Sequence, residues 1–249
     1  MAGNNNTSVV LQERDLRLLE ELQTLVVIDR EQAKLVGPFQ STTRANTRLL
    51  ALTRAGFLRR AFLGSRQAVY WLASTARQQA TQNELSRREP AAMFLRHRLE
   101  INKVHLLLKF RAIPAPGWWF VQWQGFTKNL SPAVPLIPDG YFELRSAAGV
   151  RASFLEVDLG TEALPVCQRK VQLYLQLAAS GEFSQLFHHQ QFRVLVIASS
   201  QRRLASLRQT IARLTDKIFW LTTLDSINDD RFWSAVWHRP TGNQTQSLL

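Results

Sequence analysis

The second half of the chain holds three carboxylates whose spacing suits metal-ion or proton chemistry. Asp139 lies between a proline and a glycine, and Glu156 and Asp158 lie two residues apart in an apolar stretch. Because side chains alternate along a strand, we expect Glu156 and Asp158 to share one face of a strand. Two like charges on a half-buried surface repel each other, so they need a divalent cation, a shared proton or basic side chains from a neighbouring helix.

The segments around these carboxylates have the hydrophobic periodicity of helices and strands. Helix, three strands, helix, strand is the order of the restriction-endonuclease-like core, so we predict a mixed α/β (α+β) fold with an αβββαβ domain. The expected elements are a helix at 90–112, strands at 118–123, 140–144 and 152–159, a helix at 162–179, a strand at 192–198, a helix at 200–214 and a strand at 218–222.

Length and composition set further bounds. The 249 residues suffice for one large domain or two modest ones, and 45% hydrophobic residues with seven tryptophans can build a core. The single Cys167 excludes a disulfide framework and is consistent with a cytoplasmic protein. No stretch approaches the roughly 20 apolar residues of a membrane span, so we expect no membrane contact.

The net charge of +12 is unevenly distributed. Residues 41–88 contain nine arginines and one glutamate, whereas residues 1–40 contain four basic and six acidic side chains. A guanidinium can donate two hydrogen bonds to one phosphate, so an arginine-rich segment suits nucleic acid. A solvated basic surface would have the same composition.

The pattern within this basic region favours the DNA-binding alternative. Asp29 is placed to cap a second helix, Ser41 or Thr42 to cap a third, and Gly56 to end it. Strands at 57–62 and 68–72 follow. Three helices and a basic hairpin are the parts of a winged helix-turn-helix, whose third helix enters the major groove while the wing contacts the flanking backbone.

The predicted contacts to double-stranded DNA are polar or basic side chains of the third helix and the wing. The alternative use of such a module is protein contact, including a homodimer. The residues are Thr43, Arg44, Asn46, Thr47 and Arg48 on the third helix, and Arg59, Arg60 and Arg66 on the wing.

We therefore expect three regions. Residues 1–88 form the winged helix-turn-helix domain, residues 89–240 form the restriction-endonuclease-like domain, and residues 241–249 form a flexible tail.

Two resemblances join these features. Asp139 followed by Glu156-Val157-Asp158 resembles the PD-(D/E)xK nuclease signature. More closely, nearly the whole chain resembles the replication-relaxation family of plasmids and other mobile elements. The matching features are Leu49-Leu50-Ala51-Leu52-Thr53-Arg54-Ala55-Gly56-Phe57-Leu58, His105, Pro138-Asp139-Gly140, Phe154-Leu155-Glu156-Val157-Asp158-Leu159-Gly160-Thr161-Glu162, and the spaced Lys170 and Tyr174.

The family resemblance implies a DNA-binding accessory protein of a plasmid or other mobile element. Its role would lie in replication, mobilisation or transposition, and its partners would include other proteins of these processes.

The chain departs from the nuclease signature at one position, because Asp158 stands where the signature has its lysine. Lys170 would replace that lysine from the following helix. Asp139, Glu156 and Asp158 would then hold Mg²⁺, and Lys170 would support hydrolysis of a phosphodiester. In the opposite hypothesis the domain is degenerate or serves assembly, and Lys170 and Arg169 pair with the two strand carboxylates. The sequence leaves the question of enzymatic activity open.

Overall fold

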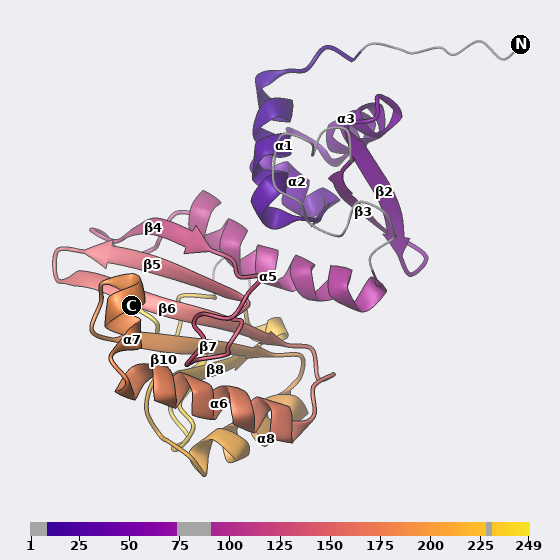
Figure 1. Cartoon of the computed structure of the whole chain (residues 1–249). Helices are drawn as coiled ribbons and strands as arrows, with labels where there is room; N and C mark the ends of the chain where they lie inside the picture. Colours follow the sequence, from indigo (N-terminus) through magenta and orange to yellow (C-terminus); the bar gives the residue numbers. More distant parts are fainter. Residues whose placement is uncertain (1–8, 74–90, 228–230) are drawn as a thin grey trace, which may run out of the picture. The chain divides into compact units, whose positions relative to one another are not determined.

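A computed structural model of the chain describes residues 9–73, 91–227 and 231–249. The chain divides into two compact units, Met1–Phe110 and Arg111–Leu249, each with its own sheet (Figure 1). The expected mixed α/β class is confirmed. Within the described ranges, no helix combines the length and the apolar character that a bilayer crossing requires.

The N-terminal unit contains helices and a small antiparallel sheet with strand order β1-β3-β2. The third helix and the β2–β3 hairpin follow each other as in a winged helix-turn-helix, with the hairpin as the wing. The elements are α1 (Glu13–Leu25), β1 (Ile28–Asp29), α2 (Arg30–Val36), α3 (Thr42–Arg54), β2 (Leu58–Leu63), β3 (Gln67–Leu72) and α5 (Ala92–Phe110).

Local chemistry fixes the ends of these helices as expected. The Asp29 carboxylate accepts a hydrogen bond from the Gln32 amide at 2.9 Å and begins α2. The Ser41 hydroxyl accepts one from the Arg44 amide at 3.2 Å and begins α3. These caps satisfy amides that a helix leaves without partners. Gly56, with φ of +80°, follows α3 in the left-handed region that glycine adopts without strain.

The long helix α5 corrects the expected domain boundary at residue 88. It packs on the N-terminal unit, where Leu106 joins the core around Leu18 and Leu49. The amide nitrogen of Asn102, which is 1% exposed, donates to the carbonyls of Leu25 at 2.9 Å and Val27 at 2.6 Å. The helix that we expected to open the second domain therefore belongs to the first compact unit. Residues 74–88, the last part of the expected first domain, lie outside the described residues.

The C-terminal unit is built on a seven-stranded mixed sheet with strand order β10-β9-β8-β7-β6-β5-β4. The β6–β7 and β7–β8 pairs are parallel and the other pairs are antiparallel. The elements are β4 (Trp119–Gln124), β5 (Gly140–Ser146), β6 (Gly149–Asp158), α6 (Leu164–Ala179), α7 (Glu182–Phe187), β7 (Phe192–Ala198), α8 (Gln201–Ala212), β8 (Phe219–Thr223), the 3₁₀ turn η2 (Leu224–Ser226), β9 (Trp237–His238) and β10 (Thr245–Gln246).

Helices α6 and α8 cover one face of this sheet (Figure 1). The core on that face joins Phe154 of β6 and Val196 of β7 to Leu177 of α6 and Leu207 of α8. Alternation along β6 then places Glu156 and Asp158 on the same helix-covered face as Phe154.

The end of the chain corrects the expected flexible tail at 241–249. Strand β10 pairs with β9, and Leu248 is 4% exposed. The Leu248 carbonyl accepts hydrogen bonds from Arg151 at 2.6 Å and Arg193 at 3.1 Å. The segment is therefore an ordered part of the C-terminal unit.

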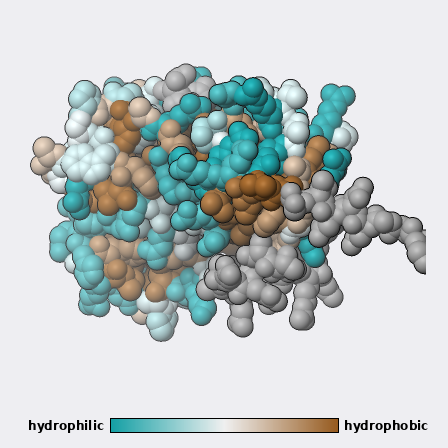
Figure 2. Space-filling view, turned by 90° about the horizontal axis from the view of Figure 1, so that it is seen from above, coloured by the Kyte–Doolittle hydropathy of each residue, from teal (hydrophilic) through white to brown (hydrophobic). Residues whose placement is uncertain are grey.

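The surface mixes hydrophilic side chains with smaller hydrophobic patches, as the face in Figure 2 illustrates. Exposed apolar residues of the described chain include Phe62 in the wing and Trp119 in the edge strand β4.

Candidate functional site

The sheet brings Asp139 next to the carboxylates of β6. Gly140 pairs with Leu155, so the residue before β5 lies beside Glu156, near the end of β6. The Asp139 Oδ2 accepts a hydrogen bond from the Val157 amide at 2.7 Å. The next residue, Gly140, lets the Trp123 ring pack on the backbone, because a Cβ there would lie 2.4 Å from that ring. Asp139 is therefore held beside Glu156, as the sequence predicted.

Glu156 is buried and both of its oxygens accept hydrogen bonds. The Tyr174 hydroxyl donates to Oε1 at 2.6 Å, and the Lys170 ammonium donates to Oε2 at 3.1 Å. Burial and the negative charge of Asp139 raise the pKa of Glu156 to about 7, although Lys170 and Tyr174 act in the opposite direction. Glu156 can therefore take up or release a proton near neutral pH.

Lys170 reaches the site from α6 and joins two carboxylates. Its Nζ also donates to Glu162 Oε1 at 3.1 Å. Burial alone would lower the pKa of Lys170, but the negative charges of Glu156, Asp139 and Glu162 raise it above its usual value. The structure thus places Lys170 beside Glu156, as the sequence predicted.

Asp158 faces a different cation. Arg203 of α8 donates from Nε to Oδ1 and from a terminal nitrogen to Oδ2, both at 2.8 Å. The Gly160 amide donates to Oδ1 at 2.7 Å. Asp158 therefore forms its ion pair with Arg203 of α8, whereas Glu156 forms one with Lys170 of α6. Arg169, the partner considered from the sequence, is exposed.

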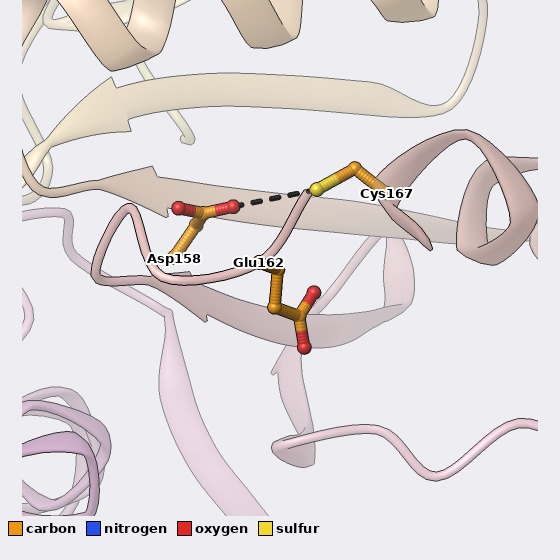
Figure 3. Close-up of side chains that lie close together, drawn as sticks. All are labelled: Asp158, Glu162 and Cys167. Carbon is orange, nitrogen blue, oxygen red and sulfur yellow. Dashed lines mark hydrogen bonds between the residues drawn. The ribbon is translucent and has the colours of Figure 1, made fainter. Parts of the chain in front are cut away.

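Cys167 lies beside Asp158 (Figure 3), and the same terminal nitrogen of Arg203 contacts both side chains. Its thiol donates to Asp158 Oδ2 at 3.6 Å, and burial together with the charge of Asp158 raises the pKa of Cys167 to about 11. The ligand atoms of Asp158, Glu162 and Cys167 lie within 4.8 Å of one another. The Arg203 guanidinium already lies among these three residues, because its terminal nitrogen also donates to the backbone carbonyl of Glu162 at 2.7 Å.

The donor set fits an ion-pair network better than Mg²⁺. Of the six carboxylate oxygens on Asp139, Glu156 and Asp158, at least five accept hydrogen bonds from donors of the chain itself. Mg²⁺ demands near-octahedral oxygen ligands and usually retains several waters. Lys170 and Arg203 already supply the positive charge at this site, and a metal ion would have to displace them.

Three residues of this network were not assigned a role from the sequence. Tyr174 and Lys170 are four residues apart, and that spacing places both on one helix face. Glu162 lies in the loop between β6 and α6. The position of Arg203 could have been predicted from the topology. A helix that follows a neighbouring parallel strand begins at the same sheet edge where β6 ends.

The predicted DNA contacts on α3 divide into exposed and structural residues. Thr43, Arg44 and Thr47 are exposed, and Asn46 is half-buried. A hollow of about 410 Å³ lies along this face of the N-terminal unit. Its lining residues are Arg14, Thr43, Arg44, Thr47, Arg48 and Ala51.

Arg48 differs from Arg44 because it forms an ion pair with a fully buried carboxylate. Its Nε donates to Asp15 Oδ1 at 2.9 Å, and a terminal nitrogen donates to Asp15 Oδ2 and to the Val10 carbonyl. Burial would raise the pKa of Asp15, but the hydrogen bonds from Arg48 and the Gln12 amide outweigh it and hold the pKa below its usual value. Arg48 thus joins α3 to α1, and its role as a base contact stays a prediction.

The wing carries an exposed basic surface. Arg59, Arg60 and Arg66 are exposed, and the Arg60 guanidinium stacks 5.1 Å from the ring centre of Phe62. Among the acidic residues that the structure describes, none forms an ion pair with these three arginines or with Arg44.

Replacing Arg48 tests its structural role. Arg48→Ala would leave the buried Asp15 without its cation, so we expect the free energy of unfolding to fall by roughly 3–5 kcal/mol in urea titrations. Arg44→Ala is the matched control on the same helix, and it should change stability by less than about 0.5 kcal/mol. Equal effects of the two substitutions would contradict this assignment.

The raised pKa of Glu156 predicts a pH dependence of stability. The folded pKa exceeds the ordinary value of 4.5, so the stabilising contribution is full below pH 4.5 and is lost as pH rises through about 7. Glu156→Gln removes the titrating group. As the pH rises from 4.5 to about 7, wild type should therefore lose about 3 kcal/mol of unfolding free energy relative to this variant. A difference that does not vary with pH would exclude the raised pKa.

Comparison with known proteins gives one result. A family model described as replication-relaxation matches residues 16–194, which is more than half of the chain and includes parts of both units. No curated protein and no solved structure matches the chain.

Proposed function

The chain belongs to the replication-relaxation family, and on this premise we propose that it is a DNA-binding accessory protein of a plasmid or other mobile element. It binds duplex DNA through the winged helix-turn-helix of the N-terminal unit. It acts together with other replication, mobilisation or transposition proteins, and its nuclease-like C-terminal unit serves assembly.

The observation that supports DNA binding most directly is the contrast between the two arginines of α3. Arg48 forms an ion pair with Asp15, whereas Arg44 lies on the exposed face with Thr43 and Thr47. A winged helix presents this face of its third helix to the major groove. The exposed arginines of the wing would hold phosphates on the flanking backbone.

The C-terminal unit has no catalytic role in this proposal, because basic side chains already pair with the carboxylates around β6. Lys170 donates to Glu156 and Glu162, and Arg203 donates to both oxygens of Asp158. These contacts neutralise the carboxylates without a metal ion. Such a network keeps the sheet and the two helices in one arrangement, which a unit used for protein assembly needs.

A metal-dependent DNA endonuclease remains the second candidate function, and one contact favours it. Lys170 lies 3.1 Å from Glu156, which also feels the charge of Asp139. Two carboxylates and a lysine therefore meet, although the lysine comes from α6 rather than from β6.

Binding assays test the DNA interface. Arg44→Gln should weaken binding to duplex DNA on the order of 10-fold, because a charge-assisted hydrogen bond to a phosphate or base edge is lost. The slope of log K against log salt should become shallower by about 0.9 if Arg44 contacts a phosphate. Arg17→Gln is the control, since Arg17 is exposed on α1 and stacks on Phe110. Wild-type affinity in the Arg44 variant, with its fold intact, would contradict the proposed interface.

A nicking assay separates the two candidate functions. With Mg²⁺ or Mn²⁺ and supercoiled plasmid, we expect wild type, Asp139→Ala and Glu156→Gln to leave the DNA uncut. Nicking by wild type that both variants lose, while they retain DNA binding, would establish the endonuclease instead.

A further inference from the structure

We propose that the C-terminal unit carries a second nucleic-acid contact, in which Arg151, Arg193 and Arg239 bind backbone phosphates from the sheet face opposite α6 and α8. This contact adds to the winged-helix interface and does not depend on it.

Strand register places the basic side chains on one face. Arg151 and Arg193 each lie an odd number of residues from Phe154 or Val194, which face the helices, so they point to the opposite side. Trp220 of β8 pairs with Leu195 and lies on that same opposite side. Arg239 directly follows His238, which pairs with Leu221 of the helix-covered core.

The contacts bring the three guanidinium groups together. Arg193 and Arg239 stack on the same Trp220 ring, at 4.7 and 4.9 Å from its centre. Arg151 and Arg193 donate to the same Leu248 carbonyl, at 2.6 and 3.1 Å. The three positive charges therefore lie in one cluster.

Aromatic rings and backbone carbonyls hold this cluster in place. Arg151 stacks 4.4 Å from the ring centre of Trp118, and a terminal nitrogen of Arg239 donates to the Asp216 carbonyl at 2.8 Å. These neutral partners fix the directions of the guanidinium groups. The Asp216 carboxylate forms no ion pair with Arg239, although its negative charge acts on Arg239 from a longer distance. Preorganised donors lose less entropy when they bind a ligand.

The cluster lacks the neutralisation that the acidic site has. In the described parts of the chain, no carboxylate forms an ion pair with Arg151, Arg193 or Arg239. Burial and the positive charges of Arg151 and Arg239 lower the pKa of Arg193 to about 10. An anion bound among the three groups would relieve this repulsion.

The chemistry of the cluster favours a nucleic-acid backbone as its ligand. All three arginines are half-buried, so part of each side chain reaches solvent. Each guanidinium donates to a carbonyl through one of its nitrogens, which leaves further donors for the paired oxygens of a phosphate.

Full-length variants test the proposal. The double variant Arg193→Gln/Arg239→Gln should weaken binding to a mixed-sequence duplex at least about 10-fold and make the salt slope shallower by about 2. Arg145→Gln is the matched control, because Arg145 is an exposed arginine that pairs with Val150 on the other face of the same sheet. Unchanged affinity in the folded double variant, or an equal loss in the control, would overturn the proposal.

The same measurement in an Arg44→Gln background separates this surface from the winged helix. A further loss of affinity there indicates an independent contact, and no further loss contradicts one. If the winged-helix interface fails its own test, the double variant still reports on the C-terminal surface alone.

Arginine modification provides a test without substitutions. Phenylglyoxal labelling of wild-type protein, read by mass spectrometry, should show that duplex DNA protects Arg151, Arg193 and Arg239 but leaves Arg145 reactive. If the three arginines react equally with and without DNA, the proposal is wrong even where the variants fail to fold.

Discussion

The burial of Glu156 and Asp158 under two helices is the constraint on which the C-terminal unit depends. An ionised carboxylate left there without a partner would cost several kcal/mol. Lys170 of α6 and Arg203 of α8 each meet one of the two charges. Both helices are therefore held against β6 by ion pairs as well as by apolar packing. The same pairs occupy the oxygens that a metal ion would need.

Much of the fold could be predicted because local patterns were unambiguous. The apolar run at 192–198 coincides with β7, and the caps at Asp29 and Ser41 lie where side-chain chemistry requires them. The partner of α5 could not be predicted, because an apolar helix indicates burial but not the surface that buries it. Contacts of Asn102 with carbonyls more than 70 residues away decide its place. The ordered end of the chain also gave no signal, since β10 is two polar residues paired through their backbones.

Only the parts of the candidate site that depend on residue spacing within a strand or helix could be predicted. Alternation placed Glu156 and Asp158 on one face, and the returning helix brought Lys170 to Glu156. The pairing of Asp158 with Arg203 depends on where α8 begins after β7, which tertiary packing sets. Arg44 and Arg48 lie one helical turn apart and have the same side chain. Their environments differ because Asp15, distant in sequence, is buried beside only one of them.

The central claim is that the chain's own cations, rather than a metal ion, neutralise the carboxylates around β6. Calorimetric titration of Mn²⁺ into wild type and into Asp139→Ala tests it most directly. We predict no saturable heat in either protein, because Lys170 and Arg203 hold the carboxylate oxygens. Saturable binding of Mn²⁺ by wild type that Asp139→Ala abolishes would contradict the account.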